Sequence, residues 1–292
     1  MAISPAHKFG QIIGEILENT MKKYFQEFAT ANNLYLDSIG KRKARSGKKV
    51  SWIDSFGNKH DLDFVLERNG TEDKIGTPVA FIESAWRRYT KHSRNKAQEI
   101  QGAVLPLAST HSHSAPFLGV ILAGVFTKGA LEQLKSSSFE VLYFEYSTVT
   151  KAFLEFGLDA SFDEDTSTDD FNKKIKAWEL FKDKEKVIDK LIEINKEKVE
   201  TFFTALKKSV DRYITEVRIL PLYGSQKVLN SIEEALQYLS TKNFPNKLDN
   251  DLVRFEVKIV YNNNDKIEAS FSDCDNAMAF LSNYKSPKLK AK

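Results

Sequence analysis

The sequence has one cysteine, Cys274, among its 292 residues. A single thiol excludes a disulfide framework and any zinc site built from several cysteines, and it is compatible with a reducing compartment. Long hydrophobic runs are also missing, because the longest apolar stretch, Ala115 to Phe126, has about half the length of a membrane-spanning helix. The amino terminus lacks the apolar segment of a signal peptide. We therefore expect a soluble, cytoplasmic protein that does not enter a membrane.

Charge of one sign is not in excess either. Lysine and arginine number 43 and aspartate and glutamate 40, so the net charge of +3 does not identify a partner. There is no G-x-x-x-x-G-K-[ST] loop for ATP and no G-x-S-x-G turn for a serine hydrolase. What the chain does contain is 41% hydrophobic and 12% aromatic residues, which is typical of a globular protein with one large or two small domains.

The first half of the chain predicts a mixed α/β fold. Helical spacing over residues 4–31 gives way to alternating patterns, and then to a helix and an almost wholly apolar strand. We expect strands over 50–56, 60–68 and 78–86, a helix over 93–107, a buried strand over 117–125, a helix over 128–134 and a strand over 139–146. The order is α-β-β-β-α-β followed by α-β, which predicts an antiparallel meander joined by a helical crossover to a parallel strand, in one mixed sheet with helices on both faces.

The stretch LDASFDEDTSTDDF (158–171) is acidic and rich in serine and threonine. We interpret it as the boundary between a domain over 1–157 and a second domain over 171–292. The second domain is predicted to be mainly helical, with a strand near 215–222, a helix over 228–240, a hairpin RFEVKIVY–NNND–KIEASF and a last helix after Asp273.

Two acidic residues stand within the expected second and third strands. If HDLDFVLER pairs with PVAFIESAW in a hairpin centred near Asp73, Asp63 lies opposite Glu83. Two facing carboxylates between apolar residues repel each other, and a divalent cation such as Mg²⁺ would remove that penalty. Asp61 shares the face of Asp63 and could be the ligand instead, whereas Glu67 is expected to be an exposed strand end. The alternative is that these carboxylates only decorate solvated strand edges.

This segment resembles the PD-(D/E)xK nuclease superfamily, which includes many type II restriction endonucleases. Asp63 in DFVLE matches the aspartate of the family's second strand, and Glu83 in AFIESA matches the acid of its third strand. Residues 93–107 match the crossover helix, FLGVILAGVF matches the buried strand, and Glu15 in GQIIGEILE resembles an acid that some members carry on the first helix. The likeness covers residues 5–146. It implies a restriction-endonuclease-like core, Mg²⁺ as cofactor and cleavage of DNA phosphodiester bonds.

The motif departs from the family at one position, where Ala85 replaces the lysine that activates the attacking water. In some members this lysine has moved elsewhere in the site. Lys91 and Lys96 are the candidates here, with a slight preference for Lys91, because a turn after the third strand could fold its side chain back. Arg87 is a further candidate cation. Glu99 lies three residues after Lys96, on the same helix face, and could supply a further acid.

Basic residues cluster in two places. The run WRRYTKHSRNK (86–96) and the segment GKRKARSGKK (40–49), which has six basic side chains in ten residues, could contact DNA phosphates or could be solvated loops. The candidate DNA-binding residues are Arg87, Arg88, Arg94, Lys41, Arg42, Lys43 and Arg45.

The resemblance implies a Mg²⁺-dependent endodeoxyribonuclease. We expect a type II restriction enzyme that cuts specific sites in double-stranded DNA, with the second domain supplying base contacts or the face of a homodimer, since the symmetry of the protein should match that of a palindromic site. Two alternatives remain open. One is a DNA repair or junction-resolving nuclease, and the other is a catalytically inactive DNA-binding module, which Ala85 would explain.

Overall fold

The computed structural model describes residues 4–221, 225–241 and 254–284. The chain divides into two compact units, residues 1–210 and 211–292. None of the helices in these described ranges is long and apolar enough to cross a membrane.

The first unit is built on a five-stranded mixed sheet in the order β1-β4-β5-β6-β7. The pairs β1–β4 and β4–β5 are antiparallel, whereas β5–β6 and β6–β7 are parallel, which confirms the predicted mixed α/β class. Its strands are β1 (Leu34–Ser38), β4 (Phe64–Arg68), β5 (Thr77–Arg87), β6 (Phe117–Gly124) and β7 (Glu140–Glu145).

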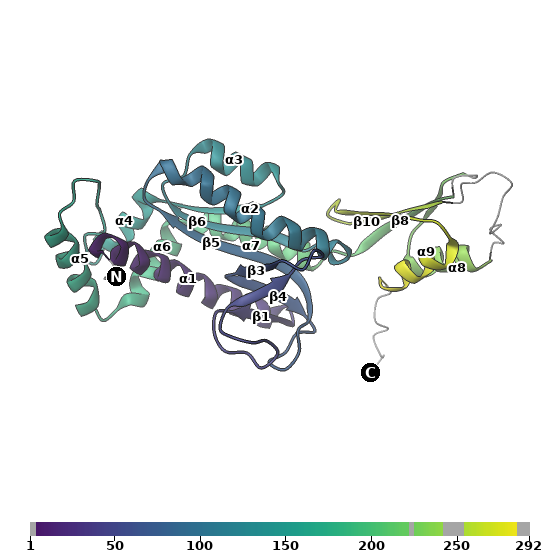
Figure 1. Ribbon diagram of the computed structural model, residues 1–292, viewed down its shortest axis with the longest axis horizontal. Helices are drawn as coiled ribbons and strands as arrows, with labels where there is room; N and C mark the ends of the chain where they lie inside the picture. The colour runs from purple at the N-terminus through teal and green to yellow at the C-terminus, as the bar shows by residue number, and fades with distance from the viewer. Residues whose placement is uncertain (1–3, 222–224, 242–253, 285–292) are drawn as a thin grey trace. The chain divides into compact units, whose positions relative to one another are not determined.

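Helices cover both faces of this sheet and enclose two hydrophobic cores (Figure 1). On one face lie α2 (Ser93–Thr110) and α3 (Lys128–Ser136), which bury Phe81 and Val120 of the sheet. On the other face lie α1 and the four helices that follow β7, which bury Ile82 and Ile121. These helices are α1 (Pro5–Ala31), α4 (Tyr146–Leu154), α5 (Thr168–Leu180), α6 (Lys184–Ile194) and α7 (Lys196–Val210).

The long first helix follows directly from the sequence. Ser4 caps its amino terminus by accepting a hydrogen bond from the His7 backbone amide, and Pro5 occupies the first turn, where a missing N–H costs nothing. Apolar residues recur every three or four positions and are buried against the sheet, as Phe9, Ile16 and Phe25 show.

The expected meander is present, but its first strand was assigned wrongly. The 50–56 segment forms β2 (Val50–Ile53), which pairs only with β3 (Lys59–Leu62) in a separate two-stranded ribbon. The sheet position expected for it is taken by β1, whose sequence LYLDS has two polar residues at its end and was not predicted as a strand. The expected strand 60–68 is interrupted at Asp63, between β3 and β4.

The predicted domain boundary at 158–171 is also wrong, because the two units meet at Val210 and Asp211. The acidic stretch carries two aromatic anchors, and both Phe162 and Phe171 pack against Phe9 of α1. Helices α5 to α7 therefore belong to the core of the first unit and not to a second domain.

The prediction that Arg42 and Arg45 contact DNA phosphates is wrong, because both side chains are buried in ion pairs. The Arg42 side chain is 1% exposed and forms two hydrogen bonds with Glu67, at 2.6 and 2.9 Å, and one with Asp37 at 2.9 Å. Arg45 also pairs with Asp37, at 3.0 Å, and is 8% exposed. Glu67, expected to be an exposed strand end, is fully buried. Lys41 and Lys43 of the same segment remain exposed.

Replacing Arg42 with alanine is expected to destabilise the first unit strongly. The change would leave Glu67 buried without its charge partner, and breaking such a pair typically costs about 3–5 kcal/mol. Lys43→Ala is the matched control, because Lys43 pairs with Asp73 in an exposed ion pair worth about 0–1 kcal/mol. Urea unfolding of both variants measures the difference, and equal midpoints would contradict a stabilising role for the buried cluster.

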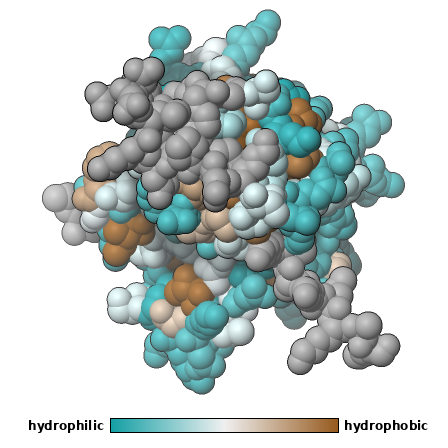
Figure 2. Space-filling model, turned by 90° about the vertical axis from the view of Figure 1, so that its right-hand side faces the viewer, coloured by the Kyte–Doolittle hydropathy of each residue, from teal (hydrophilic) through white to brown (hydrophobic). Residues whose placement is uncertain are grey.

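The second unit is a four-stranded antiparallel sheet in the order β11-β10-β8-β9 with two helices. Its elements are β8 (Ile214–Pro221), β9 (Lys227–Leu229), α8 (Ile232–Thr241), β10 (Phe255–Tyr261), β11 (Lys266–Phe271) and α9 (Cys274–Ser282). The predicted hairpin, its strand partner and the last helix, capped by Asp273, are confirmed. The expectation of a mainly helical domain is wrong, because α5 to α7 belong to the first unit and the start of the expected helix 228–240 forms β9. The face of the molecule in Figure 2 is mainly hydrophilic, with hydrophobic residues in small separate patches.

Candidate active site

The register of the central sheet brings Asp63 and Glu83 together as predicted. Phe64 pairs with Ile82, so Asp63 and Glu83 occupy the next positions of the β4–β5 hairpin. Asp63 Oδ2 accepts hydrogen bonds from the backbone N–H of Ser84 at 2.6 Å and from the Ser84 hydroxyl at 2.9 Å. Asp63 is thus fixed against the residue that follows Glu83.

Glu83 is the most unusual ionisable group of the site. It is 8% exposed, and its Oε1 atom is buried without a hydrogen-bond partner among the described residues. Burial, together with the negative charge of Asp63, raises the pKa of Glu83 to about 8. A carboxylate that is desolvated beside a second carboxylate calls for either a proton or a cation.

Lys96 is the lysine that the structure brings to this pair. It lies in the first turn of α2, its side chain is 19% exposed, and its positive charge works to lower the pKa of Glu83. Lys91, which the sequence slightly favoured, is exposed on the short 3-10 turn Thr90–His92. The turn after β5 therefore does not fold back over the acids, and α2 delivers the cation instead. Ala85 itself is buried in the core beneath α2.

A third acid comes from α1, but it is Glu18 and not the predicted Glu15. Glu15 is exposed, whereas Glu18 is half-buried. Burial raises the pKa of Glu18, and the charges of Asp63 and Glu15 raise it further. Glu18 lies one turn beyond Gly14 on the face of α1 that turns toward β5, and the docking of this helix selects it over Glu15.

Two other predicted site residues, Asp61 and Glu99, are engaged elsewhere. Asp61 binds Lys49 at 2.7 Å and the Ser51 hydroxyl at 2.6 Å, and these two hydrogen bonds lower its pKa. Glu99 is exposed and pairs with Lys96 at 3.5 Å and with Arg87 at 3.9 Å. In the described ranges, no three histidine, cysteine or acidic side chains form a ready-made cage for a metal ion. Among the acids of the site, Asp63 and Glu18 both raise the pKa of Glu83 through their charges.

Two of the three predicted arginines near the site have partners within the first unit. Arg88 donates from Nε to the Phe162 carbonyl at 2.7 Å and lies 4.0 Å from the centre of the Tyr146 ring. Arg87 donates to the Trp86 carbonyl and is partly exposed, and Arg94 is exposed on α2.

Two cavities lie beside Glu18. The larger, of about 590 Å³, lies between α1, the end of β5 and the loop 162–168, and Glu18, Ser84 and Lys96 line it. We call it the α1–β5 cavity. The smaller, of about 230 Å³, lies on the side of β3 and is lined by Glu18, Asp63 and Lys49. Glu18 lines both cavities, Asp63 lines the smaller one, and Glu83 lines neither.

Comparisons of this chain with protein-family models, with curated proteins and with solved structures found no match.

Proposed function

We propose that this chain is a divalent-metal-dependent nuclease that hydrolyses phosphodiester bonds of DNA. The observation that carries the proposal is the buried Oε1 atom of Glu83, which has no hydrogen-bond partner in the described part of the chain and lies near the charge of Asp63. A buried carboxylate next to a second carboxylate is costly unless a proton or a cation compensates its charge. Oxygen donors of this kind suit Mg²⁺, which takes one or two protein carboxylates and keeps several waters.

The residues present fit such an ion. Asp63 and Glu83 would hold it, and Glu18 could reach its water shell from α1. A bound Mg²⁺ supplies charge for a phosphoryl oxygen and lowers the pKa of a coordinated water. The ammonium group of Lys96 lies close enough to influence the charge state of Glu83, so it can also orient a water and offset negative charge that develops on the phosphate.

The order of elements in the first unit supports the same proposal. Helix α1, the antiparallel strands β1, β4 and β5, the crossover α2 and the parallel strand β6 follow the α-β-β-β-α-β order of the PD-(D/E)xK superfamily. The acids stand directly before β4 and within β5, and Lys96 would take over from the missing motif lysine at Ala85.

We further propose a type II restriction enzyme that acts as a homodimer on specific sites in double-stranded DNA. The second unit, with its own sheet and helices, would supply sequence recognition or the dimer face. Arg87, Arg94, Lys41 and Lys43 are the remaining candidates for phosphate contacts. An inactive DNA-binding module is the second candidate, favoured by the burial of Ala85 in place of a lysine.

Incubation of the full chain with unmodified plasmid and phage DNA tests the proposal. With Mg²⁺ or Mn²⁺ we expect discrete fragments, and with EDTA we expect none. Nicking, or a preference for branched DNA, would replace the restriction enzyme by a repair or junction-resolving nuclease. Retarded but uncut DNA under all metal conditions would favour the inactive module and contradict the nuclease.

The high pKa of Glu83 predicts a pH-dependent stability of the metal-free protein. The native state keeps a proton on Glu83 that the unfolded chain releases near 4.5, so this stabilising contribution is complete below that pH and is lost as the pH rises through about 8. We expect the free energy of unfolding of the wild type, relative to Glu83→Gln, to fall over this range. Mg²⁺ at pH 8 should restore stability to the wild type only. Parallel pH profiles of the two proteins would contradict the burial of an ionisable Glu83.

A further inference from the structure

One wall of the α1–β5 cavity is formed by glycine residues of α1, which have no side chains. Gly10 and Gly14 lie two turns and one turn before Glu18, on the same face of α1, and all three line the cavity. A Cβ atom at Gly14 would meet nothing within 4 Å, and one at Gly10 would make only ordinary contact, at 3.8 Å, with the Trp86 ring. Packing therefore does not require glycine at either position.

These two glycines lower the stability of helix α1, and the packing around them gives no reason for this cost. A glycine inside a helix is about 1 kcal/mol less favourable than alanine. Two such positions in one helix, both facing the same cavity, point to an occupant that needs the room. Glu83, whose Oε1 atom is buried without a partner among the described residues, directly precedes Ser84 and Ala85 of the cavity lining in the chain.

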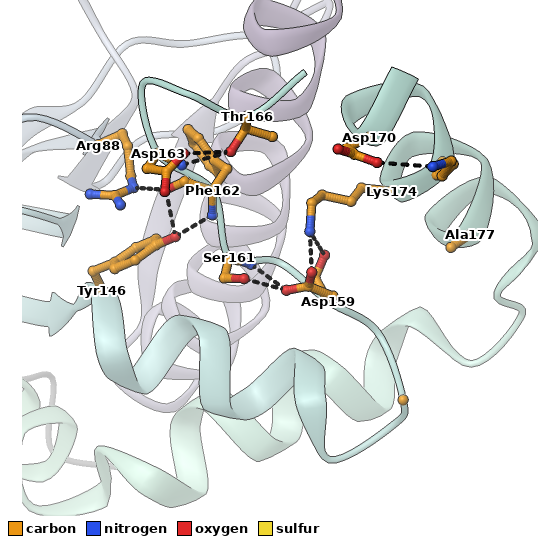
Figure 3. Close-up of a pocket in the computed structure, with 12 residues that line it drawn as sticks. Arg88, Tyr146, Asp159, Ser161, Phe162, Asp163, Thr166, Asp170, Lys174 and Ala177 are labelled. Carbon is orange, nitrogen blue, oxygen red and sulfur yellow. Dashed lines mark hydrogen bonds and ion pairs between the residues drawn. The ribbon is translucent and has the colours of Figure 1, made fainter. Parts of the chain in front are cut away.

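The opposite wall of the cavity is held in place. The Phe162 backbone donates to the Tyr146 hydroxyl at 2.7 Å, and its carbonyl accepts from Arg88 Nε at 2.7 Å. Figure 3 shows these bonds from a neighbouring pocket, which shares Arg88, Phe162, Asp163 and Thr166 with the α1–β5 cavity. The Thr166 hydroxyl donates to Asp163 at 2.9 Å and tightens the same loop. A wall with these bonds is preformed, so the cavity is a site and not a gap that closes on itself.

The lining suits a nucleotide. Trp86 and Tyr89 contribute aromatic rings to the lining, further along the chain than Glu83, and Gln11 contributes a side-chain amide. Asp163 and Glu164 of the loop would repel a phosphate but can accept hydrogen bonds from a base, so the phosphate belongs at the Lys96 end. The volume of about 590 Å³ is typical of pockets that hold one small molecule, and it is too confined for stacked base pairs.

We propose that the α1–β5 cavity takes one unpaired nucleotide of the DNA substrate, adjacent to the scissile phosphate. The nucleotide is either unpaired already or extruded from the duplex, and its base stacks on the aromatic lining. This inference rests on the proposed nuclease function and specifies its substrate as DNA with a nucleotide outside the helical stack.

The test compares Gly14→Leu with Gly102→Leu. Gly102 is the matched control, because it lies inside α2, where a Cβ atom also meets nothing within 4 Å. The probes are oligonucleotides that carry 2-aminopurine, single-stranded or in a duplex, with Ca²⁺ in place of Mg²⁺. We expect Gly14→Leu to weaken binding of the single-stranded probe about ten-fold or more, which corresponds to the loss of one base stack. In the duplex probe, we expect this variant to abolish the rise in 2-aminopurine fluorescence that the wild type produces at one position.

Gly102→Leu should leave both signals unchanged. Both leucine variants should melt at or above the wild-type temperature, because leucine favours a helix more than glycine does, so lost binding would not be lost folding. Wild-type binding and fluorescence in Gly14→Leu would overturn the cavity assignment, even if the protein cuts DNA. Conversely, loss of both signals in Gly14→Leu would uphold the nucleotide site, even if the wild type proved unable to cut DNA.

Discussion

Glu83→Gln is expected to lower metal-dependent DNA cleavage by at least about 10²-fold while the protein stays folded. The change removes the charge that would hold the cation but keeps the shape of a side chain that is 8% exposed. Several kcal/mol of charge stabilisation would be lost, and each 1.36 kcal/mol corresponds to a factor of ten in rate. Asp63→Asn should have a comparable effect. Single-turnover cleavage with saturating enzyme measures the chemical step directly.

The control for these variants is Glu132→Gln, an exposed acid on α3 that pairs with Lys128. It should cut at the wild-type rate. DNA binding without metal should be unchanged or tighter in Glu83→Gln and Asp63→Asn, because repulsion between carboxylate and phosphate is relieved. If both variants cut at wild-type rates, the acidic pair is not the catalytic centre.

Lys96→Ala is expected to slow cleavage by about 10²-fold or more, with little change in DNA affinity. A group that acts mainly in the transition state lowers the rate of the chemical step without weakening ground-state binding. Lys91→Ala is the matched comparison, because Lys91 is exposed on the turn before α2 and should leave the rate nearly unchanged. Lys96→Arg should recover part of the lost rate by restoring the charge.

Single-turnover rates and DNA affinities of the three lysine variants decide the assignment. A slow Lys91→Ala together with a normal Lys96→Ala would show that the turn rearranges around substrate and that the sequence-based preference was right. If neither variant is slow, the site works without a lysine or uses Arg87, which is partly exposed beside Glu99.

The pairing of Asp63 with Glu83 could be predicted from the sequence, because it depends only on the number of residues between two neighbouring strands. A hairpin centred near Asp73 fixes which residues oppose each other, and the pairing of Phe64 with Ile82 agrees with that centre. The bulge between Leu66 and Glu67 does not disturb this pairing, because it lies on the turn side of it. The apolar residues of β4 and β5 were likewise sufficient to place both strands, although β3 was joined to β4 in the prediction.

Other features depended on contacts between distant segments. Glu67 and Arg42 are 25 residues apart, and neither burial could be inferred until the 40–49 segment was seen to fold against the hairpin. The acidic stretch 158–171 has the composition of a linker, yet Phe162 and Phe171 anchor it to α1. In both cases a few buried side chains outweigh the average polarity of the segment.

The identity of the helix acid and of the lysine required the packing angles of whole helices. Glu15 and Glu18 differ by about one turn of α1, and only the docking of that helix on β5 decides which of them turns toward the site. Lys91 and Lys96 are similarly close in sequence, and the start of α2 at Ser93 directs Lys96 to the acids. Sequence spacing limits the candidate acid and the candidate lysine to two residues each, and the tertiary fold determines which of the two lies at the site.

Binding of Mn²⁺ to the DNA-free protein at pH 8, followed by electron paramagnetic resonance, tests the central claim most directly. The account predicts a site in the wild type that both Glu83→Gln and Asp63→Asn weaken strongly and that Glu132→Gln leaves intact. Equal binding of Mn²⁺ by all four proteins would contradict the assignment of Asp63 and Glu83 as the residues that hold the metal.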